Sequence, residues 1–148
     1  MPEFKTEGQK KIYDKLAEML RDQFGKQAMP NEKEPSFGLR SGSAYAQVGV
    51  WPISDKLTVV RAYSWVVTGA ETTPELTKFL LEENFGMRFG CFMLEPGTGD
   101  ILFSHAIVGE GMDMDELMFM VMAVIQTADE YDDKIVQRFG GQRAVDRH

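Results

Sequence analysis

The spacing of apolar residues along the chain changes from a helical period to a strand period and back again. The first pattern is helical: Thr6 and Gln9 have the spacing of a capping box, and Gly25 offers a natural end. The apolar stripe between them is formed by Ile12, Leu16, Met19, Leu20 and Phe24. Residues 26–35 combine two prolines and an asparagine with charged residues, which predicts a loop.

Five later segments alternate in polarity or concentrate β-branched and aromatic residues, as strands do. They are residues 37–40, 44–51, 57–68, 87–94 and 101–108. The turn between the second and third segments favours an antiparallel hairpin. Thr73 followed by Pro74 predicts the start of a short helix that ends by Gly86. Asp113 predicts the start of a long helix that continues to Phe139.

The resulting order, α-β-β-β-α-β-β-α, occupies nearly all of the 148 residues. It predicts a single α+β domain with a five-stranded antiparallel sheet. We expect the core within about residues 6–141 and a fraying polar tail over residues 142–148.

The two faces of the second and third predicted strands differ in character, because side chains on a strand alternate between faces. One face carries small, mostly apolar residues that a helix can approach closely. The other carries Tyr45, Gln47, Trp51, Arg61, Tyr63 and Trp65. Two interpretations are open. Either helices cover this face as well and the aromatics are core, or the face is uncovered or covered by a partner. Tyr, Trp and Arg are the residues enriched at interface hot spots, as the second interpretation requires.

The long third helix is rich in methionine. The segment that leads into it and forms its first half carries Met112, Met114, Met118, Met120 and Met122 among other apolar residues. Apolar residues all round a helix indicate burial on more than one side. The helix is therefore either a central core helix or an adaptable surface that binds a partner or forms a dimer. Both interpretations hold if a dimer partner covers one side of the helix. Met118 and Met122 are the candidates for a dimer contact or a groove.

Charge and composition exclude several classes of partner. A net charge of −7 argues against nucleic acid, which is bound by neutralising phosphates, and against an anionic membrane surface. The longest apolar run, Leu117 to Ile125, is too short to span a bilayer. The single Cys91 fits a reducing compartment, and the N-terminal residues have no apolar signal segment. We expect a cytoplasmic protein.

Catalytic and cofactor patterns are weak. Nucleophilic catalysis needs a base beside the nucleophile, but the two histidines are His105, in a strand next to Ser104 that points the other way, and the terminal His148. The glycines at residues 96–99 join two strands, so they predict a turn rather than a phosphate loop. We therefore expect no enzyme and no cofactor. A small-molecule or enzyme site around Arg61, Arg88 and His105 is the third-ranked alternative.

Acidic residues cluster late in the chain and suggest a second hypothesis, a calcium-responsive regulator. Asp113, Asp115 and Glu116 offer the hard oxygen ligands that calcium takes. The segment lacks the glycine and the closing glutamate of an EF-hand loop. Acids at a helix start are also favoured by the helix dipole alone.

Four segments resemble YbjN-domain proteins found in photosynthetic bacteria. They are VGVWPISDKLTVVRAYSWVV (48–67), NFGMRFGCFML (84–94), DILFSHAIVG (100–109) and TADEYDDKIVQRFGGQRA (127–144). The resemblance covers about residues 6–145 and implies the type III secretion chaperone-like fold, a curved antiparallel sheet with helices packed against it, commonly as a dimer. Relatives in type III secretion bind extended segments of effector proteins. The resemblance supplies no set of site residues.

The leading hypothesis is thus a homodimeric, chaperone-like or regulatory module that holds an apolar segment of an unknown protein or peptide client. A strand-like peptide could also add to a sheet edge. The expected binding residues are Tyr45, Trp51, Arg61, Tyr63 and Trp65, with Met118 and Met122.

Overall fold

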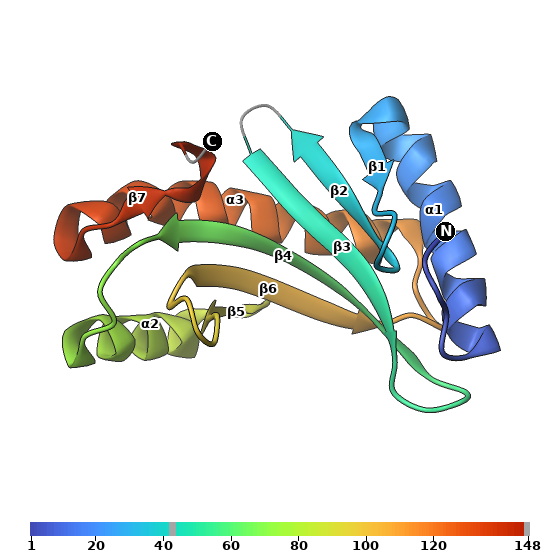
Figure 1. Ribbon diagram of the computed structural model, residues 1–148, viewed down its shortest axis with the longest axis horizontal. Helices are drawn as coiled ribbons and strands as arrows, with labels where there is room; N and C mark the ends of the chain where they lie inside the picture. The colour runs from blue at the N-terminus through green and yellow to red at the C-terminus, as the bar shows by residue number, and fades with distance from the viewer. Residues whose placement is uncertain (42–43, 147–148) are drawn as a thin grey trace.

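The computed structural model describes residues 1–41 and 44–146, which form one antiparallel sheet with helices packed against it (Figure 1). The α-helices of this part of the chain are α1 (Glu7–Phe24), α2 (Pro74–Gly86) and α3 (Met114–Phe139). The strands are β1 (Ala28–Pro30), β2 (Ser36–Ser41), β3 (Ala44–Pro52), β4 (Thr58–Thr68), β5 (Cys91–Leu94), β6 (Ile101–Val108) and β7 (Gln142–Arg143). Two short 3-10 turns are η1 (Gly25–Gln27) and η2 (Ala144–Asp146). The predicted α+β class is confirmed.

The sheet has the order β1-β2-β3-β4-β6-β5, and β7 pairs with the end of β4. Every pairing is antiparallel. The central β4 is the longest strand and curves across the molecule in Figure 1. No helix of the described residues is long and apolar enough to cross a membrane.

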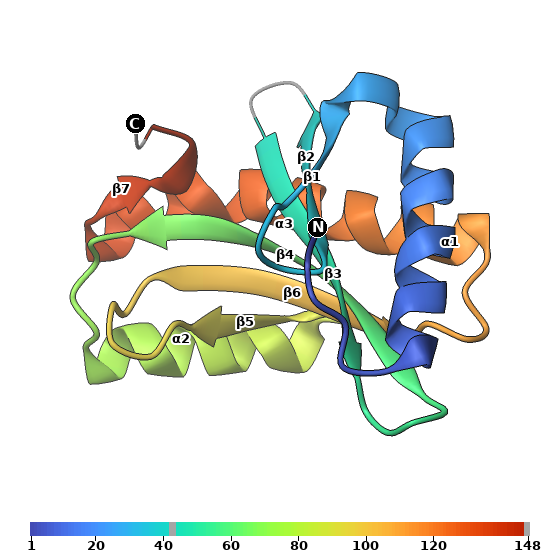
Figure 2. The ribbon, with the colours of Figure 1, turned by 45° about the vertical axis from the view of Figure 1, so that its right-hand side comes forward.

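The helices pack against one face of the sheet. Val48 and Val50 of β3 and Val60 and Ala62 of β4 point to that face and are fully buried. They belong to a single core cluster with apolar residues of α1 and α3, among them Leu16, Leu117 and Val121. Small residues on the strands let both helices approach the sheet closely, as the strand alternation predicted. In Figure 2, α1 stands beside the β1–β3 end and α2 lies along β5.

Each α-helix begins at a side-chain cap that the sequence predicts. The Thr6 hydroxyl accepts the Gln9 N–H at 3.0 Å. The Thr73 hydroxyl accepts the Leu76 N–H at 3.2 Å, and Asp113 accepts the Glu116 N–H. These bonds satisfy donors that a helix start leaves without a partner inside the helix.

The sheet has seven strands rather than the predicted five. β1 lies in the segment predicted as a loop and pairs with β2 through Ala28↔Leu39 and Pro30↔Phe37. Proline is tolerated there because β1 is at the edge of the sheet, where one side of the strand needs no donor. A three-residue strand has too short a pattern to be recognised from sequence.

The seventh strand lies in the segment predicted to fray. β3 pairs with β4 only as far as Gln47↔Tyr63, which leaves the end of β4 without that neighbour. β7 pairs there instead, through Val67↔Arg143. The Arg143 guanidinium also binds the Asp146 carboxylate, with the two shortest distances 2.7 and 3.0 Å. The expected tail is therefore ordered through residue 146, and His148 lies outside the described residues.

The strand predicted from residue 87 begins at Cys91. The Met87 N–H still bonds to the last turn of α2, at the Asn84 carbonyl, and Gly90 has a positive φ of 83° that interrupts an extended chain. The Asn84 side chain then accepts the Phe92 N–H at 2.6 Å and donates to the Phe92 carbonyl at 3.2 Å. This pair of bonds attaches α2 to the edge strand β5.

Candidate functional site

The sheet face opposite the helices carries the aromatic residues that the sequence singles out. Gln47 lies opposite Tyr63 and Gly49 lies opposite Arg61, so the alternating residues of β3 and β4 share one face. We call this surface the aromatic face and define it by Tyr45, Trp51, Arg61, Tyr63 and Trp65. The expected pairing of like with like is confirmed.

The aromatic face is not a second core. Tyr45 is 39% exposed and Arg61 is exposed, whereas their helix-facing neighbours on the same strands are fully buried. Trp51, Tyr63 and Trp65 are half-buried. Within the described residues the helices therefore leave this face open, and large side chains cover one another instead. The Tyr63 and Trp65 rings meet edge to face with centroids 5.5 Å apart.

Two glycines allow aromatic rings to lie down on the sheet. A β-carbon at Gly49 would clash with the Trp51 ring, and one at Gly38 would lie 2.7 Å from the Tyr45 hydroxyl oxygen. Gly38 and Gly49 therefore provide the floor on which these two rings rest. The Arg40 guanidinium in turn lies 5.8 Å from the centre of the Tyr45 ring, within the range of a cation–π contact.

The face also contains a hollow of about 410 Å³. Its lining comes from β3, β4, β6, β5 and the turn that follows β5: Trp51, Arg61, Tyr63, Met93, Leu94, Glu95, Pro96 and Leu102. Burial raises the pKa of Tyr63 to about 12, with Glu34 and Tyr45 adding to the shift and Arg61 opposing it. Tyr63 is therefore a neutral hydroxyl at physiological pH. The hollow combines apolar walls with polar donors, which is typical of a ligand site.

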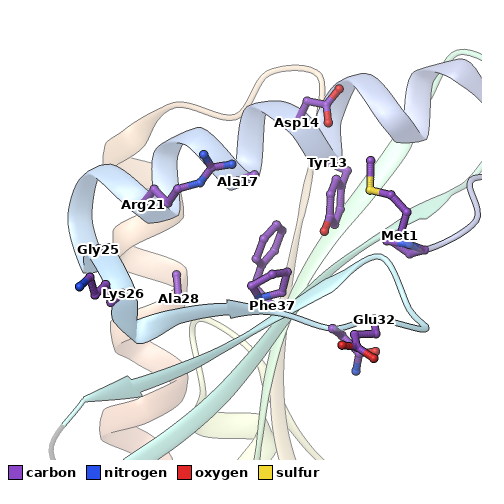
Figure 3. A pocket seen from close by; sticks show the side chains of 13 residues that line it. Met1, Tyr13, Asp14, Ala17, Arg21, Gly25, Lys26, Ala28, Glu32 and Phe37 are labelled. Atoms are coloured by element: carbon purple, nitrogen blue, oxygen red, sulfur yellow. The ribbon is translucent and has the colours of Figure 1, made fainter.

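A larger groove of about 750 Å³ lies between α1 and the edge strand β1. Figure 3 shows Tyr13 and Phe37 facing each other across it, with Asp14 and Arg21 along its helical side. The two rings stack with centroids 4.8 Å apart. Sequence reasoning missed this groove because it assigned β1 to a loop. The only signal in the sequence for a strand beside β2 was the alternation of the apolar residues Phe37 and Leu39 within β2 itself.

A third apolar surface lies on the outside of α2. Leu81 is 69% exposed and Phe85 is 97% exposed, and both line a shallow depression of about 510 Å³ on the outside of the helix. Sequence reasoning missed these residues too. The available signal was that both fall outside the buried stripe of Leu76 and Leu80.

Met118 and Met122, the candidates on the third helix, are half-buried on α3. The exposed residue beside them is Phe119, which meets Phe89 with ring centroids 4.8 Å apart. Met112 and Met120, by contrast, are core residues. The methionine-rich segment is thus divided between the core and a half-covered edge, and a binding role for Met118 and Met122 stays a prediction.

The residues considered for a small-molecule or enzyme site are not brought together in the described part of the chain. Arg61 lies opposite Ala106, whereas His105 lies opposite Ala62, so Arg61 and His105 point to opposite faces of the sheet. The pocket considered around Arg61, Arg88 and His105 is therefore not formed. The Ser104 hydroxyl contacts the Met93 sulfur rather than a base. Burial lowers the pKa of His105, whose Nδ1 has no partner among the described residues.

The proposed calcium ligands also serve another purpose. Asp113 is the cap of α3, and its Oδ1 accepts the Glu116 N–H at 2.8 Å. No three His, Cys, Asp or Glu side chains among residues 1–41 and 44–146 are placed to hold a metal ion. The calcium interpretation therefore has no preformed site in this part of the chain.

Comparison with known proteins identifies the architecture. A family model described as T3SS (YopN, CesT) and YbjN peptide-binding chaperone 1 matches residues 10–147. The crystal structure of the ExsC–ExsE complex contains a chain that matches with a TM-score of 0.63 and 12% identity, over 82% of this chain and 93% of that one. The crystal structure of YbjN from E. coli matches with a TM-score of 0.58 and 12% identity, over 85% and 93%. No curated protein matches.

Proposed function

Because the chain belongs to the family of T3SS and YbjN peptide-binding chaperones, we propose that it holds an extended segment of a partner protein on the aromatic face, without catalysing a reaction. The membership confirms the resemblance that the four sequence segments indicate. The two solved structures share the fold of the chain, and their low identity means that the binding residues must be argued from this molecule alone.

The observation that carries the proposal is the composition of the open face. Both tryptophans of the chain and two of its four tyrosines lie on the sheet surface that the helices leave uncovered. Trp and Tyr offer a large contact area at a low cost in side-chain entropy, and with Arg they dominate interface hot spots. Half-exposed aromatic residues gathered on one uncovered face are typical of a binding surface.

The shape of the face suits an extended segment. The Trp51 and Tyr45 rings lie flat over Gly49 and Gly38, so the surface there is broad and shallow. The hollow beside Trp51 and Tyr63 has a volume of about 410 Å³, which is room for a large side chain. An extended chain places alternate side chains on one side, and one of them can enter the hollow while its neighbours lie over the flat rings.

The groove beside α1 offers a second contact area for the same client. It borders β1, an edge strand with one side that makes no pairing in the described sheet. A strand-like segment that added to this edge would gain backbone hydrogen bonds, while its apolar side chains could enter the groove above the buried Tyr13 and Phe37 rings.

We also propose that the protein is a homodimer that buries the outside of α2. A side chain as large as Phe85 is rarely 97% exposed unless it serves an interface, and Leu81 lies one helical turn before it. This surface lies apart from the aromatic face, so a dimer that uses it leaves both copies free to bind clients.

The test is capture of partners from a host lysate by the purified protein, followed by mass spectrometry. Wild type is compared with Tyr45→Ala and Trp65→Ala, and with Ile53→Ala, which removes an exposed apolar side chain from the turn after β3. Partners retained by wild type and Ile53→Ala but lost from folded Tyr45→Ala and Trp65→Ala support the aromatic face. Equal retention by all four proteins would contradict it. Thermal unfolding of each variant establishes that the fold is intact.

A further inference from the structure

We propose that the aromatic face selects its client by a carboxylate: an Asp or Glu side chain, flanked by apolar residues in an extended segment, enters the hollow and binds Arg61. The inference rests on the peptide-binding function proposed above and specifies which segments qualify. Three features support the inference: the surroundings of Arg61, the polar residues that line the hollow, and the hydrogen bond that Glu95, the acidic residue of the lining, already makes.

Arg61 lies on β4 and is exposed on the aromatic face, although the Trp51 ring covers its cross-strand neighbour Gly49. Its cross-strand neighbours are Gly49 on β3 and Ala106 on β6, neither of which has a side chain long enough to cover the guanidinium. Arg61 is exposed, and among residues 1–41 and 44–146 it has no ion-pair or hydrogen-bond partner. The other arginine of this face, Arg40, lies instead over the Tyr45 ring.

Two of the residues that line the hollow with Arg61, namely Tyr63 and Trp51, have a side chain that can donate a hydrogen bond. Burial raises the pKa of Tyr63 to about 12, so its hydroxyl keeps its proton under all physiological conditions. Glu34 and Glu95 also lie close enough to Tyr63 to add to its raised pKa, so the surroundings carry negative charge as well. An arginine beside two further donor side chains suits a ligand group that accepts hydrogen bonds, as an ionised carboxylate does. A planar guanidinium can hold both oxygens of such a group at once.

The carboxylate that lines the hollow, Glu95, is engaged elsewhere. Its Oε1 accepts the Thr98 hydroxyl at 3.0 Å within the turn that joins β5 to β6. Glu95 therefore has a hydrogen-bond partner in its own turn and, in the described part of the chain, forms no ion pair with Arg61. The remaining walls, Met93, Leu94 and Leu102, are apolar. A charge-assisted hydrogen bond gains strength where such walls exclude water.

The charge of the whole protein makes this arrangement selective. The chain carries a net charge of −7, so an acidic segment is repelled by the protein in general. Only a segment that places its carboxylate at Arg61, with apolar neighbours over Trp51 and Trp65, recovers that cost. The selectivity thus combines one attractive contact with a repulsive surround.

The experiment is a selection from a random phage-displayed peptide library on the immobilised full chain, with Arg61→Gln and Arg40→Gln in parallel. Arg40→Gln is the matched control because it removes the same charge from the same face. We expect wild type and Arg40→Gln to enrich peptides with an Asp or Glu at a constant distance from apolar residues, and Arg61→Gln to lose that acidic preference while it keeps the apolar one.

An enriched peptide and its Glu→Gln analogue are then titrated against each protein, with the fluorescence of Trp51 and Trp65 as the signal. We expect wild type to bind the acidic peptide about tenfold more tightly than the analogue, since a charge-assisted bond is being exchanged for a neutral one. Arg61→Gln should bind both equally, and added salt should reduce the difference in wild type.

The outcomes separate the two proposals. Apolar peptides enriched without an acidic position, or a preference that survives Arg61→Gln, would overturn the carboxylate inference and leave the peptide-binding function standing. A library that yields no peptide above the blank surface would overturn both.

Discussion

The indole ring of Trp51 lies over Gly49, two residues earlier on the same strand, and occupies the space that a β-carbon there would need. The glycine interrupts a strand of otherwise larger residues, and this contact supplies the physical reason. It allows a large ring to lie flat at the border of the hollow, beside Arg61, the cross-strand partner of Gly49. The geometry of the proposed binding surface thus depends on a residue without a side chain.

Gly49→Ala should displace the Trp51 ring and destabilise the protein by about 1–3 kcal/mol, the usual cost of inserting a methyl group where the packing is already close. In a Trp65→Phe background, Trp51 is the only tryptophan, and its emission should shift to longer wavelength as the ring moves toward water. Gly38→Ala is the matched control, because there the added methyl meets the far end of Tyr45, which can swing away. Equal, small effects of the two changes would show that Gly49 does not position Trp51.

Asp113→Ala should lower the free energy of unfolding by about 1 kcal/mol, because the side chain caps α3. Asp115→Ala, in the first turn but without such a bond, should cost less. Urea unfolding measures both. Excess calcium should leave the midpoint of wild type unchanged. A calcium-dependent rise that Asp113→Ala abolishes would instead restore the metal hypothesis.

Asp132 should make the protein less stable as the pH rises from acid to neutral. It is only 3% exposed, and burial raises the pKa of its carboxyl above the ordinary value of 3.8. A raised pKa in the folded state favours folding below the unfolded pKa, and that benefit is lost as the pH rises through the folded value.

Asp132→Asn removes this titration and keeps an oxygen that can accept the Asp133 N–H. The variant should therefore gain stability relative to wild type between acid and neutral pH. Unfolding free energies measured across that range test the sign. If the difference in unfolding free energy between the two proteins did not change with pH, burial of Asp132 would not destabilise its ionised form.

Phe85→Glu should convert the proposed dimer into a monomer, because it replaces the most exposed apolar side chain of α2 with a charge. Ile53→Glu, at a position that is 59% exposed in a turn, is the control and should leave the dimer intact. Light scattering coupled to gel filtration reports the molar mass of each. Wild type that elutes as a monomer at every concentration would contradict the proposal.

The elements with a repeating pattern were predictable from the sequence. The capped helices, the strands β2, β3 and β4 and the alternation of Tyr45, Trp51, Tyr63 and Trp65 all depend on contacts between residues near in sequence or on a period of two or 3.6. Neighbouring residues therefore carry the information. The confirmed family resemblance adds the overall fold for the same reason, since it rests on whole segments rather than single residues.

Very short strands, and contacts between segments far apart in the sequence, were not predictable from local patterns. β1 and β7 are three and two residues long, too short to show a strand pattern, and each is ordered by pairing with another strand: β1 with β2, and β7 with the end of β4. The groove beside Tyr13 exists only because β1 is placed opposite α1. The exposure of Phe85 depends on which side of α2 meets the sheet, and the sequence shows apolar residues on both sides.

The sequence by itself therefore determined the order of the elements and which side chains share a strand face, because the pleat of a strand and the turn of a helix are local properties. The tertiary structure alone decided that the helices cover the small-residue face, that Arg61 and His105 point apart and that the aromatic face stays open. Those outcomes depend on how distant segments pack, and packing is a property of the assembled chain rather than of any window along it.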